Sequence, residues 1–501
     1  MTMLRRILVI SGAGILGAAG LALVQIRVGS LFGLSGELDA FFVGAALPSV
    51  LLAIGAGTIS AFIVPRLPSD DQEATARGAG RAVTLGLLIS VPLTGLLVAA
   101  APVIVAVIAP GLDQSVAEQA TRVLRIYSLT TPGTAIAFVY FAYGYASGRI
   151  WTAGLTTAIY ALAWFGLLFV PALSDSVESA ALAGLIATGV QVVAAFLIGS
   201  HGVGRPWPSA RPGWVSRASL TALAAVLGAA IVARSGLLLD PLYGSFLSEG
   251  AVSELSFATR IAALAIFVCA QGASYSLLII SRDRQAADGA DFRVGLVAPL
   301  LLSITAAITL VITGPALAEL ILARGELSDA EARAVGELLR LWAPSVIAFT
   351  LVGALEMMLY AEKRVNEVLW RGMWGLGVNV AASAPLVVLL GAEGRPLGVL
   401  AGVAAQLWLL LYLFRRDGRL QVLRERSTAR RALAHALAAA AIVAATFTGL
   451  SGLVSSELAA VIAILAVGAV TLLSLRSYQA HQVELASAPP ADVGFGTELR
   501  G

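Results

Sequence analysis

The sequence predicts an all-α, polytopic membrane protein with fourteen transmembrane helices. Hydrophobic residues make up 58% of the 501 residues and charged residues only 13%, with a mean hydropathy of +0.88. A soluble domain carries about 25% charged residues, so most of this chain cannot face water. A helix needs about 20 apolar residues to cross the hydrocarbon core of a bilayer. Runs of that kind recur along the whole chain between short clusters of charged residues.

The predicted spans are connected by loops too short to fold as domains. They cover residues 7–28, 40–64, 82–108, 123–145, 153–170, 179–200, 218–237, 252–279, 294–318, 339–361, 373–391, 397–414, 432–450 and 457–475. The predicted organisation is an N-lobe (1–200), a cytoplasmic connector (201–217), a C-lobe (218–414), a basic connector (415–431), a final helix pair (432–475) and a disordered tail (476–501).

A repeated offset predicts that the two lobes arose from one duplicated unit. Four pairs of residues lie 215 positions apart in the sequence: Arg125 and Arg340, Arg149 and Arg364, Asp39 and Glu254, and Gly57 and Gly272. A unit of six helices is an even number, so both copies insert in the same orientation. We therefore expect two pseudo-symmetric six-helix lobes, related by an axis along the membrane normal, with a cavity between them.

The charges predict topology and exclude several functions. Lys and Arg concentrate in the loops of one side, which places both termini in the cytoplasm. Because these basic residues are dispersed over short loops, the net charge of +3 does not indicate nucleic-acid binding. The single cysteine, Cys269, excludes a disulfide or a cysteine-based metal site. The three histidines lie far apart in the sequence, and neither a metal nor a cofactor is expected.

The second span opens with acidic residues and contains a proline. Residues 36–71 read GELDAFFVGAALPSVLLAIGAGTISAFIVPRLPSDD. A proline inside a membrane helix frees a carbonyl group that water or a neighbour must satisfy, so Pro48 fits a helix bent around a cavity. Asp39 would then lie at the outer mouth of that cavity. Alternatively, Asp39 is a solvated residue at a helix start, the interpretation that we assign to Glu37.

Three charged residues lie inside predicted spans. Arg260 lies about two turns inside its span, where an arginine costs about 2.5–3.5 kcal/mol at the bilayer centre. It is expected to face a water-filled cavity, with snorkelling or an acidic packing partner as the alternatives. Arg27 lies near the outer end of the first span, where it can snorkel more easily. Glu356 lies about a turn and a half from a cytoplasmic helix end and can be interfacial.

Several segments resemble the MurJ (MviN) family of lipid II flippases. They are DAFFVGAALPSVLLAIGAGTISAFIVPRL, the ATR that ends at Arg260, and GELSDAEARAVGELLRLWAPSVIAFTLVGALEMMLYAEKR. That family belongs to the multidrug/oligosaccharidyl-lipid/polysaccharide (MOP) exporter superfamily. The resemblance implies two six-helix lobes around a cationic cavity that opens alternately to each side. It also implies that the last two helices form a side groove for a polyprenyl tail.

The chain departs from the family at the cavity. Family members place arginines at the positions of Ala18, Val24 and Leu52, and only Arg260 keeps its expected place. Arg27, three residues beyond Val24, can substitute on a similar helix face.

The chain also departs from the family at the positions for ion coupling. The resemblance implies that sodium-coupled members use carboxylates on the seventh and eleventh spans, which are 218–237 and 373–391 here. The span 218–237 contains no carboxylate, and the span 373–391 offers Asn379 and Ser383. We class these two residues, with Glu254 and Glu356, as candidate ion or gate contacts.

These observations favour a non-enzymatic flippase in the bacterial cytoplasmic membrane. It would carry a polyprenyl-diphosphate-linked saccharide, such as lipid II, for peptidoglycan or other cell-surface polysaccharide synthesis, alongside cell-envelope biosynthesis proteins. Arg260, Arg27 and Asp39 are the candidate substrate contacts. The alternatives are a MATE-like cation antiporter, which needs a carboxylate deep in a helix, and a degenerate paralogue that does not transport. A membrane glycosyltransferase would need paired carboxylates, or an acid with a histidine, at one surface.

Overall fold

The computed structural model of the chain is helical throughout its described residues and contains no strand in them. These residues are 3–63, 67, 72–147, 149, 151–200, 206–209, 228, 236–282, 289–362, 364–417, 426–451, 454–456, 458–464 and 466. The α-helices are α1 (Met3–Phe32), α2 (Gly36–Ile63), α3 (Gln72–Ile108), α4 (Gln114–Ser128), α5 (Thr130–Ala146), α6 (Thr152–Leu167), α7 (Val177–Ser200), α9 (Gly236–Gly244), α10 (Ala251–Arg282), α11 (Gly289–Leu322), α12 (Asp329–Ala361), α13 (Val365–Leu390), α14 (Gly394–Arg416) and α15 (Arg426–Ser451). Two short 3-10 helices, η2 (Pro171–Leu173) and η3 (Gly391–Glu393), precede α7 and α14.

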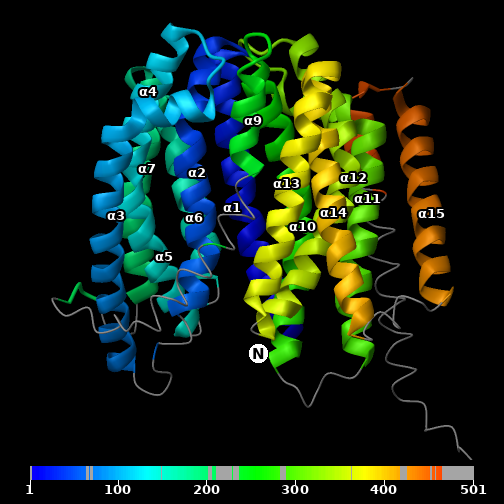
Figure 1. Cartoon of the computed structure of the whole chain (residues 1–501), viewed down its shortest axis with the longest axis horizontal. Coiled ribbons are helices and arrows are strands. Elements are labelled where there is room, and N and C mark those ends of the chain that lie inside the picture. The colour runs from blue at the N-terminus through cyan, green and yellow to red at the C-terminus, as the bar shows by residue number, and fades with distance from the viewer. Residues whose placement is uncertain are drawn as a thin grey trace, which may run out of the picture.

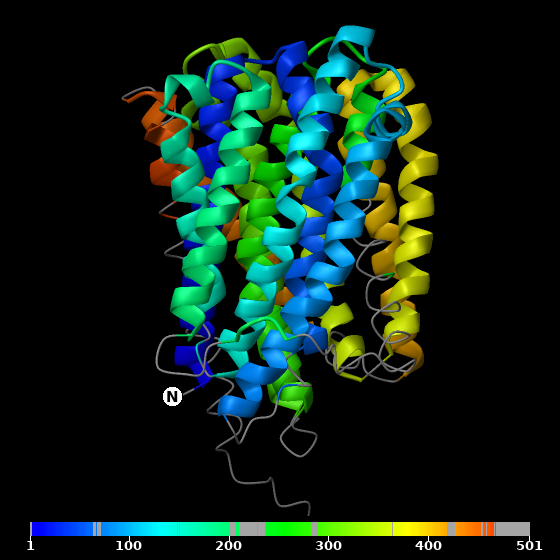
Figure 2. The ribbon, with the colours of Figure 1, turned by 90° about the vertical axis from the view of Figure 1, so that its left-hand side faces the viewer.

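The helices form two groups that lie side by side (Figure 1). We call α1–α7 the N-terminal bundle and α9–α14 the C-terminal bundle. Figure 2 faces the N-terminal bundle, in which long helices such as α3 run along the height of the molecule, while the short α4 lies at one end (Figure 1). In the C-terminal bundle, α12 packs on α10, α11 and α14, and α13 pairs with α14. Helix α15 packs on α11 at the outside of this bundle (Figure 1).

Length and composition identify several helices that can cross a membrane. In the described part of the chain, six segments are long and apolar enough, and one of them, Val365–Arg416, contains both α13 and α14. Three shorter apolar stretches are Leu16–Phe32, Thr152–Leu167 and Leu437–Leu450. The fold is therefore that of a multi-pass membrane protein, and the number fourteen stays a prediction. The span 218–237, apart from 228 and 236–237, and most of 457–475 lie outside the described residues.

One predicted span is wrong. The range 123–145 crosses the end of α4 and the start of α5, which are separate helices. Helix α4 ends at Leu129, whose N–H donates to the carbonyl of Ile126 at 3.1 Å. Pro132 lies in the first turn of α5, where its missing N–H costs nothing and its ring prevents α4 from continuing.

The principal apolar core joins the two bundles. Val24 and Phe42 from the N-terminal bundle and Phe257 and Leu339 from the C-terminal bundle belong to one cluster of buried side chains. The rings of Phe42 and Phe257 meet edge to face, with 5.2 Å between their centroids. Such a contact adds about 0.5–1.5 kcal/mol to the area that it buries.

Arginines at equivalent helix ends fasten the last helix of each bundle. Arg149, between α5 and α6, donates to the carbonyl of Ile198 in α7 at 2.9 Å. Arg364, between α12 and α13, pairs with Asp417 at the end of α14 at 2.7 Å and with Glu367 at 2.6 Å. The hydrogen bond with Glu367, and then that with Asp417, raises the pKa of Arg364 above its ordinary value.

Glycine allows α13 and α14 to approach closely. A Cβ atom at Gly402 would lie 2.5 Å from the Cβ of Asn379 and 2.7 Å from the carbonyl oxygen of Gly375. A Cβ at Gly398 would collide with Ser383. This close approach brings the polar side chains of α13 against α14.

We predict that Gly402→Ala lowers the melting temperature by several degrees. The added methyl group meets backbone and must push the helices apart, which typically costs about 1–3 kcal/mol. The matched control is Gly377→Ala in α13, because a Cβ there has nothing within 4 Å. That substitution should be neutral or stabilising, since alanine gains about 1 kcal/mol of helix propensity over glycine. Equal melting temperatures for the two variants would contradict the close approach.

Candidate functional site

Asp39 connects the two bundles at the end of the molecule where α2 and α10 begin. It belongs to α2, and its side chain is only 3% exposed. Its carboxylate accepts hydrogen bonds from the backbone N–H of Gly250 at 2.8 Å and from that of Ser253 at 2.7 Å. The hydroxyl of Ser253 donates a third at 2.6 Å. Asp39 therefore caps the N-terminus of α10 from the other bundle, where the helix dipole favours an anion.

The connection is reciprocal. The Glu249 carboxylate, from the C-terminal bundle, accepts from the backbone N–H of Gly36 at the start of α2 at 2.8 Å. Two further bonds cross between the bundles. Glu326 N–H donates to the Ser30 carbonyl at 3.0 Å, and Gly111 N–H donates to the Ser245 hydroxyl at 3.2 Å. We call these residues together the seam: Ser30, Gly36, Asp39, Gly111, Ser245, Glu249, Gly250, Ser253 and Glu326.

Arg260 lies where the bundles meet. Its guanidinium is 4.7 Å from the ring centroid of Phe42 in α2, and it interacts electrostatically with Tyr127 and Asp240. Within the described part of the chain, it makes no hydrogen bond and no ion pair. A guanidinium has five N–H donors in a planar fork that matches phosphate or carboxylate oxygens. Arg260 thus presents unused donors at the boundary of the two bundles.

An ion pair that the sequence analysis missed is buried inside the C-terminal bundle. Arg395, in the first turn of α14, and Asp240, in α9, are joined by a 2.8 Å contact, and their side chains are 1% and 4% exposed. The second carboxylate oxygen of Asp240 accepts from Thr259 at 2.7 Å. This corrects the inference that the seventh predicted span, 218–237, carries no carboxylate. The predicted span ends too early, because α9 covers Gly236–Gly244 and contains Asp240.

One sequence signal could have revealed this pair. Arg395 stands between Gly394 and Pro396 at a helix start, where the dipole disfavours a cation. An arginine in that position needs a carboxylate partner. Asp240, followed by Pro241, lies three residues beyond the predicted span, so hydropathy alone placed it in a loop.

The candidate ion or gate residues of α12 and α13 are engaged in internal bonds. Asn379 Oδ1 accepts from Arg395 at 2.8 Å and from the Ser383 hydroxyl at 3.0 Å. Glu356 accepts from the Gln406 side chain at 2.7 Å. Asn379 and Gln406 also line a cavity of about 60 Å³ between α9, α12, α13 and α14. Asn379 and Ser383 lie one helical turn apart on α13, and both accept hydrogen bonds from the guanidinium of Arg395.

Arg27 lies apart from Arg260. Its guanidinium is 4.6 Å from the ring centroid of Phe169 and donates to the carbonyl of Leu168 at 3.4 Å and to the hydroxyl of Ser30 at 3.4 Å. These contacts hold α1 to the end of α6, within the N-terminal bundle. No contact joins the two arginines in the described part of the chain.

The remaining predicted positions differ in their surroundings. Glu254 is half-buried in the first turn of α10, with Glu393 near enough to repel it. Val24 is fully buried in the apolar core, and Ala18 is half-buried. The side chain of Leu52 lies outside the described residues.

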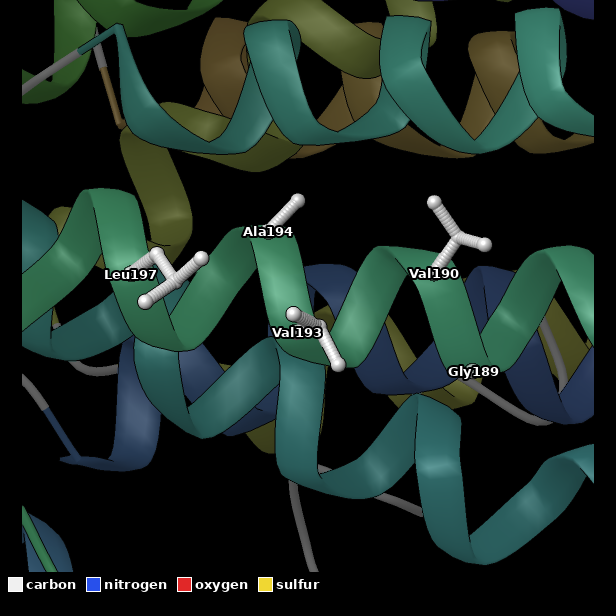
Figure 3. Close-up of a pocket in the computed structure, with 5 residues that line it drawn as sticks. All are labelled: Gly189, Val190, Val193, Ala194 and Leu197. Carbon is white, nitrogen blue, oxygen red and sulfur yellow. The ribbon is translucent and has the colours of Figure 1, made fainter.

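An apolar groove runs along the outer face of α7. It has a volume of about 440 Å³ and is lined by Gly189, Val190, Val193, Ala194 and Leu197 (Figure 3). Val193 and Leu197 are 58% and 59% exposed. Because every lining side chain is hydrocarbon or hydrogen, this groove suits an acyl chain and offers nothing to a charged headgroup.

Comparisons with known proteins agree with this architecture. The family model described as lipid II flippase MurJ matches residues 28–477. No curated protein shows a significant match. A solved lipid II flippase MurJ in an inward closed conformation has a TM-score of 0.75 at 16% identity, covering 95% of this chain and 99% of that one. An inward-facing multidrug resistance MATE family transporter of the MOP superfamily has a TM-score of 0.63 at 16% identity, covering 83% and 95%.

A further solved structure is a MOP superfamily transporter from Pyrococcus furiosus, described as having a binding pocket of reverse polarity. Its TM-score is 0.62 at 17% identity, with 83% of this chain and 96% of that chain covered. At these identities, the solved structures establish the fold.

We predict that Asp39→Ala opens the seam. The substitution leaves two backbone N–H groups and a hydroxyl without their acceptor, and hydrogen bonds to a charged group contribute about 1.5–3 kcal/mol each. A probe cysteine at Ala251, which is 3% exposed, placed in a Cys269→Ala background, should react with a membrane-impermeant maleimide at least about tenfold faster. Glu37→Ala is the control, since Glu37 is exposed on the same helix turn. An unchanged labelling rate in Asp39→Ala would show that Asp39 does not hold the seam.

Proposed function

Because this chain belongs to the lipid II flippase MurJ family, we propose that it moves a polyprenyl-diphosphate-linked saccharide across the cytoplasmic membrane by alternating access. Arg260 is the observation that carries this proposal. It is a half-buried guanidinium without a hydrogen bond or ion pair to any described residue, and it lies between the two bundles. An arginine kept inside a membrane protein at this cost serves a ligand or a pathway.

The headgroup chemistry fits this residue. A diphosphate offers paired oxygen acceptors, and charge-assisted, bidentate bonds to guanidinium are among the strongest hydrogen bonds in proteins. Phe42 holds the guanidinium plane from one side through a cation–π contact at 4.7 Å. Asp240 interacts electrostatically with Arg260, but its charge is paired with Arg395, so the charge of Arg260 remains available to the headgroup. Flipping requires no covalent chemistry, so no catalytic residue is assigned.

The seam is the proposed outer gate. In this conformation, the hydrogen bonds of Asp39 and Glu249 close the end at which α2 and α10 begin. The headgroup would bind from the cytoplasmic leaflet while the seam is closed. Separation of the bundles at the seam would then release the headgroup outward. In this proposal, Asp39 is a gate residue and does not contact the substrate.

The proposed architecture is fourteen helices with two six-helix lobes, 1–200 and 218–414, and both termini in the cytoplasm. Support comes from the seam, where the bond between Ser30 and Glu326 recurs 215 residues away as the bond between Ser245 and Gly111. At the opposite helix ends, Arg149 and Arg364, which are 215 residues apart, each contact the last helix of their own bundle or the residue that follows it. Two copies inserted in one orientation account for both observations.

The final helix pair, 432–475, would serve the lipid tail. Its first helix, α15, packs on α11 through Ala439 and Val443, and His435 bonds to Thr305 at 2.9 Å. Small residues at such an interface allow close helix packing in lipid. A pair attached to one bundle leaves an apolar side surface on which a polyprenyl chain can lie outside the headgroup cavity.

The cation-antiporter alternative is not favoured. Among the described residues, Asp39 and Asp240 are the acidic side chains that are fully buried, and both are occupied by internal hydrogen bonds. Neither offers an open carboxylate to an organic cation.

We predict that Arg260→Ala weakens binding of lipid II in nanodiscs by about 10- to 100-fold, because it removes one or two charge-assisted hydrogen bonds. Arg260→Lys should also weaken binding, since lysine keeps the charge but loses the paired donors. The control is Arg333→Ala, whose arginine is 60% exposed and pairs with Glu319.

The melting temperature of each Arg260 variant separates binding from packing. A packing role predicts a lower melting temperature for alanine and normal binding for lysine. Unchanged affinity in Arg260→Ala would disprove the headgroup assignment and favour a paralogue that does not transport.

We predict that a cysteine introduced in the connector 415–431 reacts with an impermeant maleimide only after the membrane is permeabilised. This segment is rich in arginine, and loops rich in Lys and Arg lie on the cytoplasmic side of the membrane. Reaction in intact cells would reverse the proposed topology.

A further inference from the structure

Oxygen atoms from four residues converge on the Arg395 guanidinium. They are the Asp240 carboxylate at 2.8 Å, the Asn379 amide oxygen at 2.8 Å, the Ser383 hydroxyl at 3.1 Å and the Gly236 carbonyl at 3.0 Å. The arginine is 1% exposed, so water does not share these contacts. Four of the five guanidinium N–H groups are thereby used inside one bundle.

The same four oxygen atoms would form a cation site without the guanidinium. Carboxylate, amide, hydroxyl and backbone carbonyl oxygens are the ligands that hard cations prefer. The set carries one net negative charge, and a buried carboxylate without a counter-ion is very costly in a protein interior. A cation at the centre of this group removes that cost, and here the cation is covalently part of the chain.

We propose that Arg395 is a built-in cation that permanently fills an oxygen-lined cation site in the C-terminal bundle. The chain therefore works without binding sodium or another free cation at Asp240. The resemblance noted in the sequence implies sodium-coupled relatives with carboxylates on the corresponding helices. The residues of this chain do not fit a free ion, because the guanidinium of Arg395 already donates to all four of these oxygen acceptors.

The surroundings leave no second place for an ion in this group. The other Asp240 oxygen is taken by Thr259 at 2.7 Å, and Asn379 Oδ1 also accepts from Ser383. Gly398 packs so closely that a Cβ would collide with Ser383. The 60 Å³ cavity that borders Gly236 and Asn379 is the space through which a free cation would reach the site if the arginine side chain were removed.

The test compares cation dependence of the whole protein in detergent, with the melting temperature and ²²Na⁺ binding as readouts. The wild type should melt at the same temperature in sodium, potassium and N-methyl-D-glucamine chloride of equal ionic strength, and should bind no ²²Na⁺ saturably. Arg395→Ala should melt lower in N-methyl-D-glucamine. Sodium, or guanidinium at low millimolar concentration, should restore several degrees in a saturable manner.

Two matched variants keep the test decisive. Arg395→Ala combined with Asp240→Asn removes the negative charge and should lose the cation response. Arg395→Lys keeps an internal cation and should stay insensitive to the choice of salt, which remains measurable even if the alanine variant does not fold. Saturable sodium binding to the wild type would overturn the inference, as would an Arg395→Ala protein that responds equally to all salts. No lipid-linked substrate enters this assay, so its outcome is independent of the proposed transport function.

Discussion

The arrangement of the molecule depends on two carboxylates that cap helices of the opposite bundle. Asp39 holds the start of α10, and Glu249 holds the start of α2. The first N–H groups of any helix lack intrahelical partners, and these two helices start at the junction of the bundles. Each bundle therefore completes the hydrogen bonding of the other. The same two helices also meet in the buried core, where Phe42 of α2 packs against Phe257 of α10.

Much of the helical framework follows from the sequence because lipid permits few alternatives. An apolar run in a bilayer must satisfy its own backbone, so composition and length predict helices well. Helices α1, α2, α6, α7, α10 and α14 agree with predicted spans within about four residues at each end, whereas α3, α12 and α13 begin eight to ten residues earlier than predicted. The exception, α4 and α5, depends on Pro132 and local turn bonds that a hydropathy window averages away. The resemblance to flippases, carried by the segment around Asp39 and by Arg260, agrees with the family match.

The polar interior could not be predicted in the same way. Asp240 and Arg395 are 155 residues apart, and each lies just outside an apolar run. The sequence offers Asn379 and Ser383 as candidate ion or gate contacts, but nothing in their own helix indicates a guanidinium beside them. A buried ion pair is stable only when further hydrogen bonds complete it. Arg395 obtains these from two other helices, α9 and α13, which makes the pair a property of the tertiary fold.

The seam contains bonds that do not depend on side-chain identity. Glu326 meets Ser30 through backbone atoms alone, and Gly250 adopts a φ of 84° against the carbonyl of Leu34. Contacts of this kind tolerate sequence divergence, because most substitutions leave backbone donors and acceptors in place. Gly250 is the exception, since a side chain there would be strained and would meet backbone. The backbone part of the seam can therefore persist while the sequence diverges, whereas the bonds of Asp39, Glu249 and Ser245 require those side chains.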